Sequence, residues 1–61
     1  MDLSIFQAFS SMRAAEANME MTREMVSLQS FQTLTNMVNQ GQFKDMDEAI
    51  ASYKSFKQTS R

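Results

Sequence analysis

Glycine and proline, the residues that most often interrupt helices and strands, are almost absent from this chain of 61 residues. There is no proline, and the only glycine is Gly41. Because these residues mark most turns, the sequence predicts one clear turn between a long segment and a short one. The long segment is rich in alanine, glutamate, arginine and methionine between Met12 and Met25, and these residues favour helix. We therefore expect an all-α fold in a single small domain over residues 1–61.

Capping residues mark the turn and the second helix. Gly41 can adopt the left-handed conformation that commonly ends a helix. Asp45, followed three residues later by Glu48, matches a capping box, in which these side chains bind free N–H groups at a helix start. The pattern predicts a helical hairpin, with a long first helix over about residues 4–39 and a shorter second helix over about residues 45–57.

The long first helix can be read in two ways. Apolar and small residues follow a coiled-coil-like spacing up to Val26, and a second apolar stripe then continues on a neighbouring face. One continuous helix would bury a stripe that drifts around it. Alternatively, two helices meet near Ser27 and Ser30, whose hydroxyls compete for backbone hydrogen bonds. We favour the continuous helix, because no residue there forces a break.

A hairpin with such unequal arms leaves the start of the long arm without a partner in the same chain. The apolar stripe there contains two phenylalanines, and an uncovered stripe of this kind is typical of an interaction surface. The chain also lacks cysteine and histidine, so association remains as the means to stabilise so small a core. We expect an oligomer or a larger protein assembly, with a protein-binding face formed by Ile5, Phe6, Phe9, Met12, Met19, Val26 and Phe31.

Seven methionines and five phenylalanines are the most unusual part of the composition. Methionine is flexible and polarisable, so it suits both irregular cores and adaptable binding surfaces. We interpret Met37, Phe43 and Met46 as core residues of the hairpin.

No pattern in the sequence indicates catalysis, a cofactor or a metal. Histidine and cysteine are absent, and there is no glycine-rich phosphate loop. Glu16, Glu20 and Glu24 are spaced by four, and we interpret them as an exposed ridge, because helical di-metal sites also require histidine. We expect a protein that is not an enzyme and that binds no cofactor, metal or small-molecule substrate.

The charge balance and hydropathy restrict the partners further. Six basic and seven acidic residues give a formal net charge of −1, which makes nucleic acid an unfavoured partner. No apolar run approaches the roughly 20 residues of a membrane-spanning helix, and the start lacks a basic signal-peptide region. We expect a soluble protein, in the cytoplasm or in a virion or secretion assembly, a choice that the sequence leaves open.

Residues 41–50 (Gly-Gln-Phe-Lys-Asp-Met-Asp-Glu-Ala-Ile) resemble the turn and second helix of ribbon-helix-helix antitoxins of the ParD type. The resemblance implies a DNA-binding dimer, whose strand would fall around residues 22–28 and carry Arg23, while Ala51 replaces an arginine usual in that family. Residues 43–47 with Ala49 and Ile50 are also similar to the C-terminal helix of type III secretion needle subunits, which are helical hairpins that polymerise.

The leading hypothesis is a structural or adaptor subunit that binds its own copies or another protein through a Met/Phe-rich helical face, as in a phage virion or a secretion-type assembly. One alternative is a ribbon-helix-helix DNA-binding dimer. The other is a small regulatory protein that docks one host enzyme.

Overall fold

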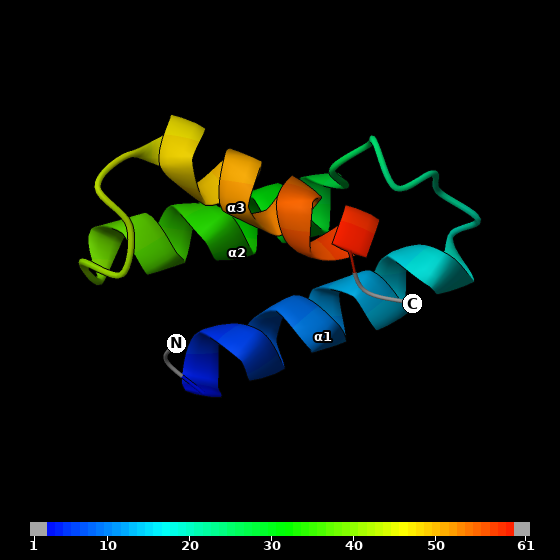
Figure 1. Cartoon of the computed structure of the whole chain (residues 1–61), viewed down its shortest axis with the longest axis horizontal. Coiled ribbons are helices and arrows are strands. Elements are labelled where there is room, and N and C mark those ends of the chain that lie inside the picture. Colours follow the sequence, from blue (N-terminus) through cyan, green and yellow to red (C-terminus); the bar gives the residue numbers. More distant parts are fainter. Residues whose placement is uncertain (1–2, 60–61) are drawn as a thin grey trace.

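A computed structural model describes residues 3–59, except for the side chain of Leu3 (Figure 1). This part of the chain contains three helices and no strand: α1 (Leu3–Asn18), α2 (Leu28–Asn39) and α3 (Met46–Thr59). Helices α2 and α3 form an antiparallel hairpin, and α1 packs against α3. In Figure 1, α1 runs in the same general direction as α3 and returns to α2 through a long loop.

The predicted helix over residues 4–39 is wrong, and so is the two-helix hairpin built on it. Helix α1 ends at Asn18, and residues 19–27 form an irregular loop that includes the segment where the antitoxin resemblance would place a strand. The break lets α1 fold back and bury Phe9 and Met12 inside the chain, which a straight helix could not do. The free energy gained by burying these two side chains outweighs the free energy that the loop sequence would gain as helix.

The end of α1 has the hydrogen-bond pattern of a Schellman motif, which closes a helix with one left-handed residue. The N–H of Met21 donates to the carbonyl of Glu16 (3.3 Å), and the N–H of Glu20 donates to the carbonyl of Ala17 (3.1 Å). Glu20 holds the left-handed position, with φ of 58°. This position usually carries glycine, so no local residue marked the break in advance.

Helix α2 begins at a serine, as the alternative interpretation proposed. Ser27 is the N-cap residue, and its hydroxyl accepts a hydrogen bond from the N–H of Ser30 (3.0 Å). Such a bond satisfies one of the free N–H groups at a helix start. The serines near residues 27–30 therefore start a new helix rather than interrupt a long one.

The predicted turn between α2 and α3 is confirmed. Gly41 has φ of +82° and follows the C-cap of α2, where a second Schellman motif forms. The N–H of Glu48 donates to the side chain of Asp45 (2.8 Å), as the capping box predicts. The Glu48 carboxylate reaches one residue further back than usual, to the N–H of Lys44 (3.1 Å).

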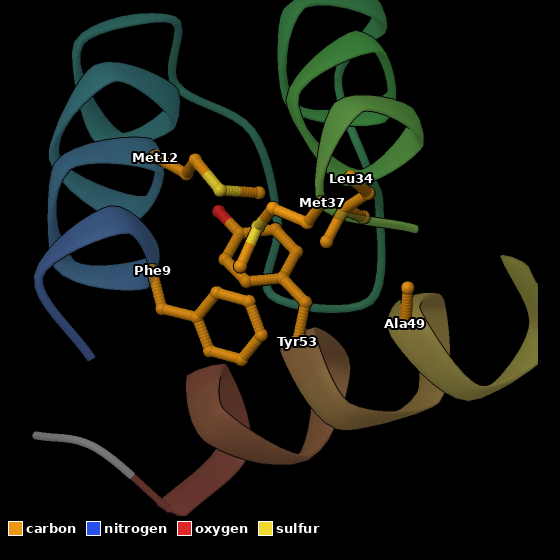
Figure 2. Close-up of a cluster of buried hydrophobic side chains, with 6 residues drawn as sticks. All are labelled: Phe9, Met12, Leu34, Met37, Ala49 and Tyr53. Carbon is orange, nitrogen blue, oxygen red and sulfur yellow. The ribbon is translucent and has the colours of Figure 1, made fainter. Parts of the chain in front are cut away.

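The hydrophobic core receives two side chains from each helix, and Figure 2 shows them pointing toward one another around the ring of Tyr53. The residues are Phe9 and Met12 of α1, Leu34 and Met37 of α2, and Ala49 and Tyr53 of α3. Phe43 and Met46 are half-buried against this cluster, so the core interpretation of Met37, Phe43 and Met46 is confirmed.

Within residues 3–59, no helix is both long enough and apolar enough to cross a membrane.

Candidate functional site

An open groove with a volume of about 600 Å³ lies between α1 and α3. Its lining comes from three parts of the chain: Ile5, Phe6 and Phe9 of α1, Phe43 of the connector, and Ala51, Ser52, Ser55, Phe56 and Thr59 of α3. We call this surface the aromatic groove. The break after Asn18 creates it, because it brings the start of α1 beside α3.

Ring contacts hold the aromatic side chains of the groove in place. The rings of Phe9 and Phe43 stack with centroids 6.0 Å apart, and Phe9 also meets Phe56 at 5.5 Å. Phe6 contacts the ring of Phe56 edge to face at 5.7 Å. Edge-to-face and offset-stacked arrangements are the favourable geometries for aromatic pairs. The groove is thus formed before any ligand arrives.

Hydroxyl groups line the α3 side of the aromatic groove. Ser52, Ser55 and Thr59 contribute them, and Thr59 donates its hydroxyl hydrogen to the carbonyl of Ser55 (3.0 Å). None of the lining residues is ionisable. The groove can therefore offer apolar contacts and hydrogen bonds to a ligand, but no general acid or base from its own lining.

A second feature is a buried polar cluster, the Glu16 network, where α1, the loop, α2 and α3 meet. One carboxylate oxygen of Glu16 accepts hydrogen bonds from the Tyr53 hydroxyl (2.8 Å) and the Lys57 ammonium (2.9 Å). The other accepts the N–H of Ser27 (2.8 Å), which completes the cap of α2 from another helix. Lys57 also donates to the carbonyl of Met25 and lies 4.5 Å from the centroid of the Tyr53 ring.

These contacts shift the pKa values of two groups in the network. Burial raises the pKa of Glu16, but the hydrogen bonds from Lys57, Ser27, Ser30 and Tyr53 together outweigh burial and lower this pKa to about 2. Burial, and then the hydrogen bond to Glu16, raise the pKa of Tyr53 above its ordinary value. Glu16 is therefore a carboxylate and Tyr53 a neutral phenol near neutral pH. The network acts as a structural anchor for the loop.

The prediction of an exposed glutamate ridge is wrong for Glu16. Glu20 and Glu24 are exposed in the loop, whereas Glu16 is buried. Its position relative to Phe9 and Met12, at spacings of seven and four, gave the available signal. A helix places such residues on one face, so the carboxylate had to enter the core with a partner.

The predicted protein-binding residues are divided among three environments. Phe9 and Met12 are core residues, and Ile5 and Val26 are half-buried against the core. Phe6, Met19 and Phe31 are exposed. Ile5, Phe6 and Phe9 come together in the aromatic groove, whereas Met12, Met19, Val26 and Phe31 do not line it. The sequence interpretation missed the contribution of α3, because a short second helix was not expected to reach the start of the first.

Three further exposed apolar side chains, which we call the α2 ridge, lie at the end of the loop and in the first turn of α2: Met25, Leu28 and Phe31. The exposed fractions of these side chains are 53%, 73% and 44%. Leu28 is the first residue of α2, and none of the three lines the aromatic groove. These exposed side chains are therefore separate from the aromatic groove.

No model of a known protein family matches this chain, and neither does any curated protein or any solved structure.

Proposed function

We propose that this chain is a non-enzymatic structural or adaptor subunit that binds a polypeptide segment in the aromatic groove. The observation that carries the proposal is the solvent-open aromatic lining, drawn from α1, the connector and α3 and fixed by ring contacts. A preformed apolar site spends little binding free energy on ordering its own side chains. Aromatic side chains, phenylalanine included, are also enriched in protein interfaces.

The chemistry of the lining favours a polypeptide ligand with apolar side chains. The groove volume of about 600 Å³ is enough for a few inserted side chains. The hydroxyls of Ser52, Ser55 and Thr59 lie along one side, where they can bind amide groups of the inserted segment. An apolar centre with a polar edge is the usual arrangement of protein interfaces.

The DNA-binding alternative has less support from the charges on the loop. In the antitoxin resemblance, residues 22–28 would contact DNA, and Arg23 is their only basic residue. Glu24 adjoins it, so this segment carries no net positive charge. Affinity for DNA depends on cations that neutralise phosphates. A regulatory protein that docks one enzyme would use the same groove, and the identity of the captured partner distinguishes that case.

Site-specific photo-crosslinking tests the proposal. A benzophenone amino acid replaces Ser55, which lines the groove, and in a matched control replaces Gln58, which is also exposed on α3 but lies outside the lining. In cells that produce this protein, we expect polypeptide adducts from position 55 and few from position 58. Equal labelling at both positions, or no adduct at position 55, would contradict the proposal.

A further inference from the structure

A second pocket, smaller than the aromatic groove, lies where the end of α1, the loop and the end of α3 meet. Its volume is about 310 Å³. Three cationic side chains line it: Arg13 of α1, Arg23 of the loop and Lys57 of α3. We call it the basic pocket. It shares no lining residue with the aromatic groove, so the two sites are independent.

The lining of the basic pocket has an excess of positive charge. Glu16 is its only carboxylate, so three cations leave a formal charge of +2, in a chain whose formal net charge is −1. Both oxygens of Glu16 already accept hydrogen bonds within the Glu16 network, and Lys57 balances its charge at 2.9 Å. The excess charge therefore comes from the two arginines, and it favours an anionic ligand.

The loop side of the basic pocket offers hydrogen-bond donors that no acceptor occupies. Arg23 is exposed and forms no ion pair within residues 3–59, although Glu20 and Glu24 are close to it in sequence. The N–H groups of Thr22 and Arg23, and the Thr22 hydroxyl, donate to no acceptor in the same part of the chain. A ligand that only accepts hydrogen bonds would satisfy this set of donors.

Arg13 forms the opposite side of the pocket, and an aromatic ring helps to position it. Its guanidinium carbon lies 5.8 Å from the centroid of the Phe56 ring, within the range of a cation–π contact. A planar guanidinium can donate two parallel hydrogen bonds to the oxygens of one phosphate or carboxylate. The fold thus brings two arginines from different elements to one pocket, although they lie on either side of the break after Asn18.

We propose that the basic pocket binds the phosphate monoester group of a ligand, with Arg13 and Arg23 contacting its oxygens from two sides. Near neutral pH, such a group carries a charge of about −1.5 to −2 and three strong acceptor oxygens. It therefore matches both the excess charge of the lining and its unoccupied donors. A single carboxylate, or one phosphodiester of a nucleic acid, would supply only one negative charge.

Titration with methyl phosphate, followed by the NMR shifts of the backbone amides, tests the proposal. Sodium chloride keeps the ionic strength constant, and at about pH 7.5 the phosphate is mainly a dianion, because its second pKa is about 6. We expect saturable shifts concentrated at Arg13 and at residues 21–23. Methyl sulfate has a similar shape but only one negative charge, so it should bind about tenfold more weakly, as expected when charge-assisted contacts weaken.

Two charge-matched variants locate the site. Arg23→Gln should weaken the binding of methyl phosphate about tenfold, because it removes a charge-assisted contact. Lys44→Gln removes the same charge from an exposed residue outside the pocket and should leave the affinity unchanged. Arg13→Gln should act like Arg23→Gln, and circular dichroism checks that each variant is folded.

A second measurement identifies the source of the phosphate group. Phosphatidic acid carries a phosphate monoester as its headgroup, so phosphatidylcholine vesicles that contain it present the same chemistry on a membrane. Co-sedimentation that Arg23→Gln abolishes and Lys44→Gln preserves would assign the group to a lipid. Binding of methyl phosphate without co-sedimentation would assign it to a soluble ligand.

Three outcomes would overturn the inference: no saturable shift with methyl phosphate, equal affinity for methyl phosphate and methyl sulfate, or equal losses in Arg23→Gln and Lys44→Gln. The last result would mean that the anion responds only to the overall charge of the chain. None of these results bears on the aromatic groove, because the two sites have no lining residue in common.

Discussion

Glu16 and Lys57 form a buried ion pair of 2.9 Å, although they lie 41 residues apart in the chain. Their side chains are 4% and 2% exposed. A buried charge is costly without a partner, so each residue depends on the other. Through Ser27 and Met25, the pair also fixes the start of α2 and the end of the loop. The Glu16–Lys57 pair thus both stabilises the fold and positions the backbone of the α2 ridge.

Replacement of Lys57 by methionine should lower the free energy of unfolding by about 3 kcal/mol, because Glu16 would remain buried without its cation. The double variant Glu16→Gln/Lys57→Met should be more stable than Lys57→Met alone, since the neutral amide needs no cation. Urea unfolding followed by circular dichroism measures both. Lys54→Met is the control, with an expected change within about 0.5 kcal/mol. Equal losses for the two lysine variants would contradict a specific role for the pair.

The low pKa of Glu16 predicts a loss of stability in acid. The folded-state pKa of about 2 lies below the ordinary value of 4.5, so the folded state binds the proton less readily than the unfolded state. The stabilisation is complete above about pH 4.5 and is lost as the pH falls through about 2. This difference corresponds to roughly 3 kcal/mol. Urea unfolding between pH 6 and pH 2 should therefore show a steeper decline for the original chain than for Glu16→Gln, and parallel curves would refute the assignment.

Glu20→Gly should increase stability by about 0.5 to 1 kcal/mol, because Glu20 occupies a left-handed conformation that glycine adopts without steric cost. Glu20→Ala removes the same charge but keeps the steric cost, so it serves as the matched control. Thermal unfolding of the two variants gives the comparison. A glycine variant no more stable than the alanine variant would show that Glu20 is not strained.

The parts of the fold that the sequence predicted are those with local causes. Gly41 and the pair Asp45 and Glu48 act on backbone groups a few residues away, so their patterns can be read along the chain. The break after Asn18 has no such mark, because a glutamate holds the left-handed position. Its stabilisation comes from Glu16 reaching Tyr53 and Lys57 in the last helix, which requires the tertiary fold.

The same contrast between local and tertiary causes applies to the candidate site. Sequence spacing identified Ile5, Phe6 and Phe9 as an apolar cluster, but their position relative to α3 depended on the unpredicted break. Phe56 contacts both Phe6 and Phe9 across that interface, so it entered the site only through tertiary structure. Apolar spacing alone did not distinguish a core residue from a groove residue.

Phe6 and Phe9 should respond differently to truncation, because one is 46% exposed and the other 5% exposed. Phe9→Ala should lower the free energy of unfolding by about 3 to 4 kcal/mol, since it removes a ring from the core and from contacts with Phe43, Tyr53 and Phe56. Phe6→Ala should cost about 1 kcal/mol, because it loses one edge-to-face contact and part of a half-exposed surface.

The same pair of variants separates binding from folding. Urea unfolding gives the stability of each variant, and crosslinking from position 55 gives the binding of the folded protein. Phe6→Ala should remain folded and yet lose most of the adduct, because its ring forms part of the groove lining. Retention of full crosslinking in folded Phe6→Ala would mean that bound polypeptides do not contact this ring. The contact would then have to lie at another part of the groove lining, such as Phe43.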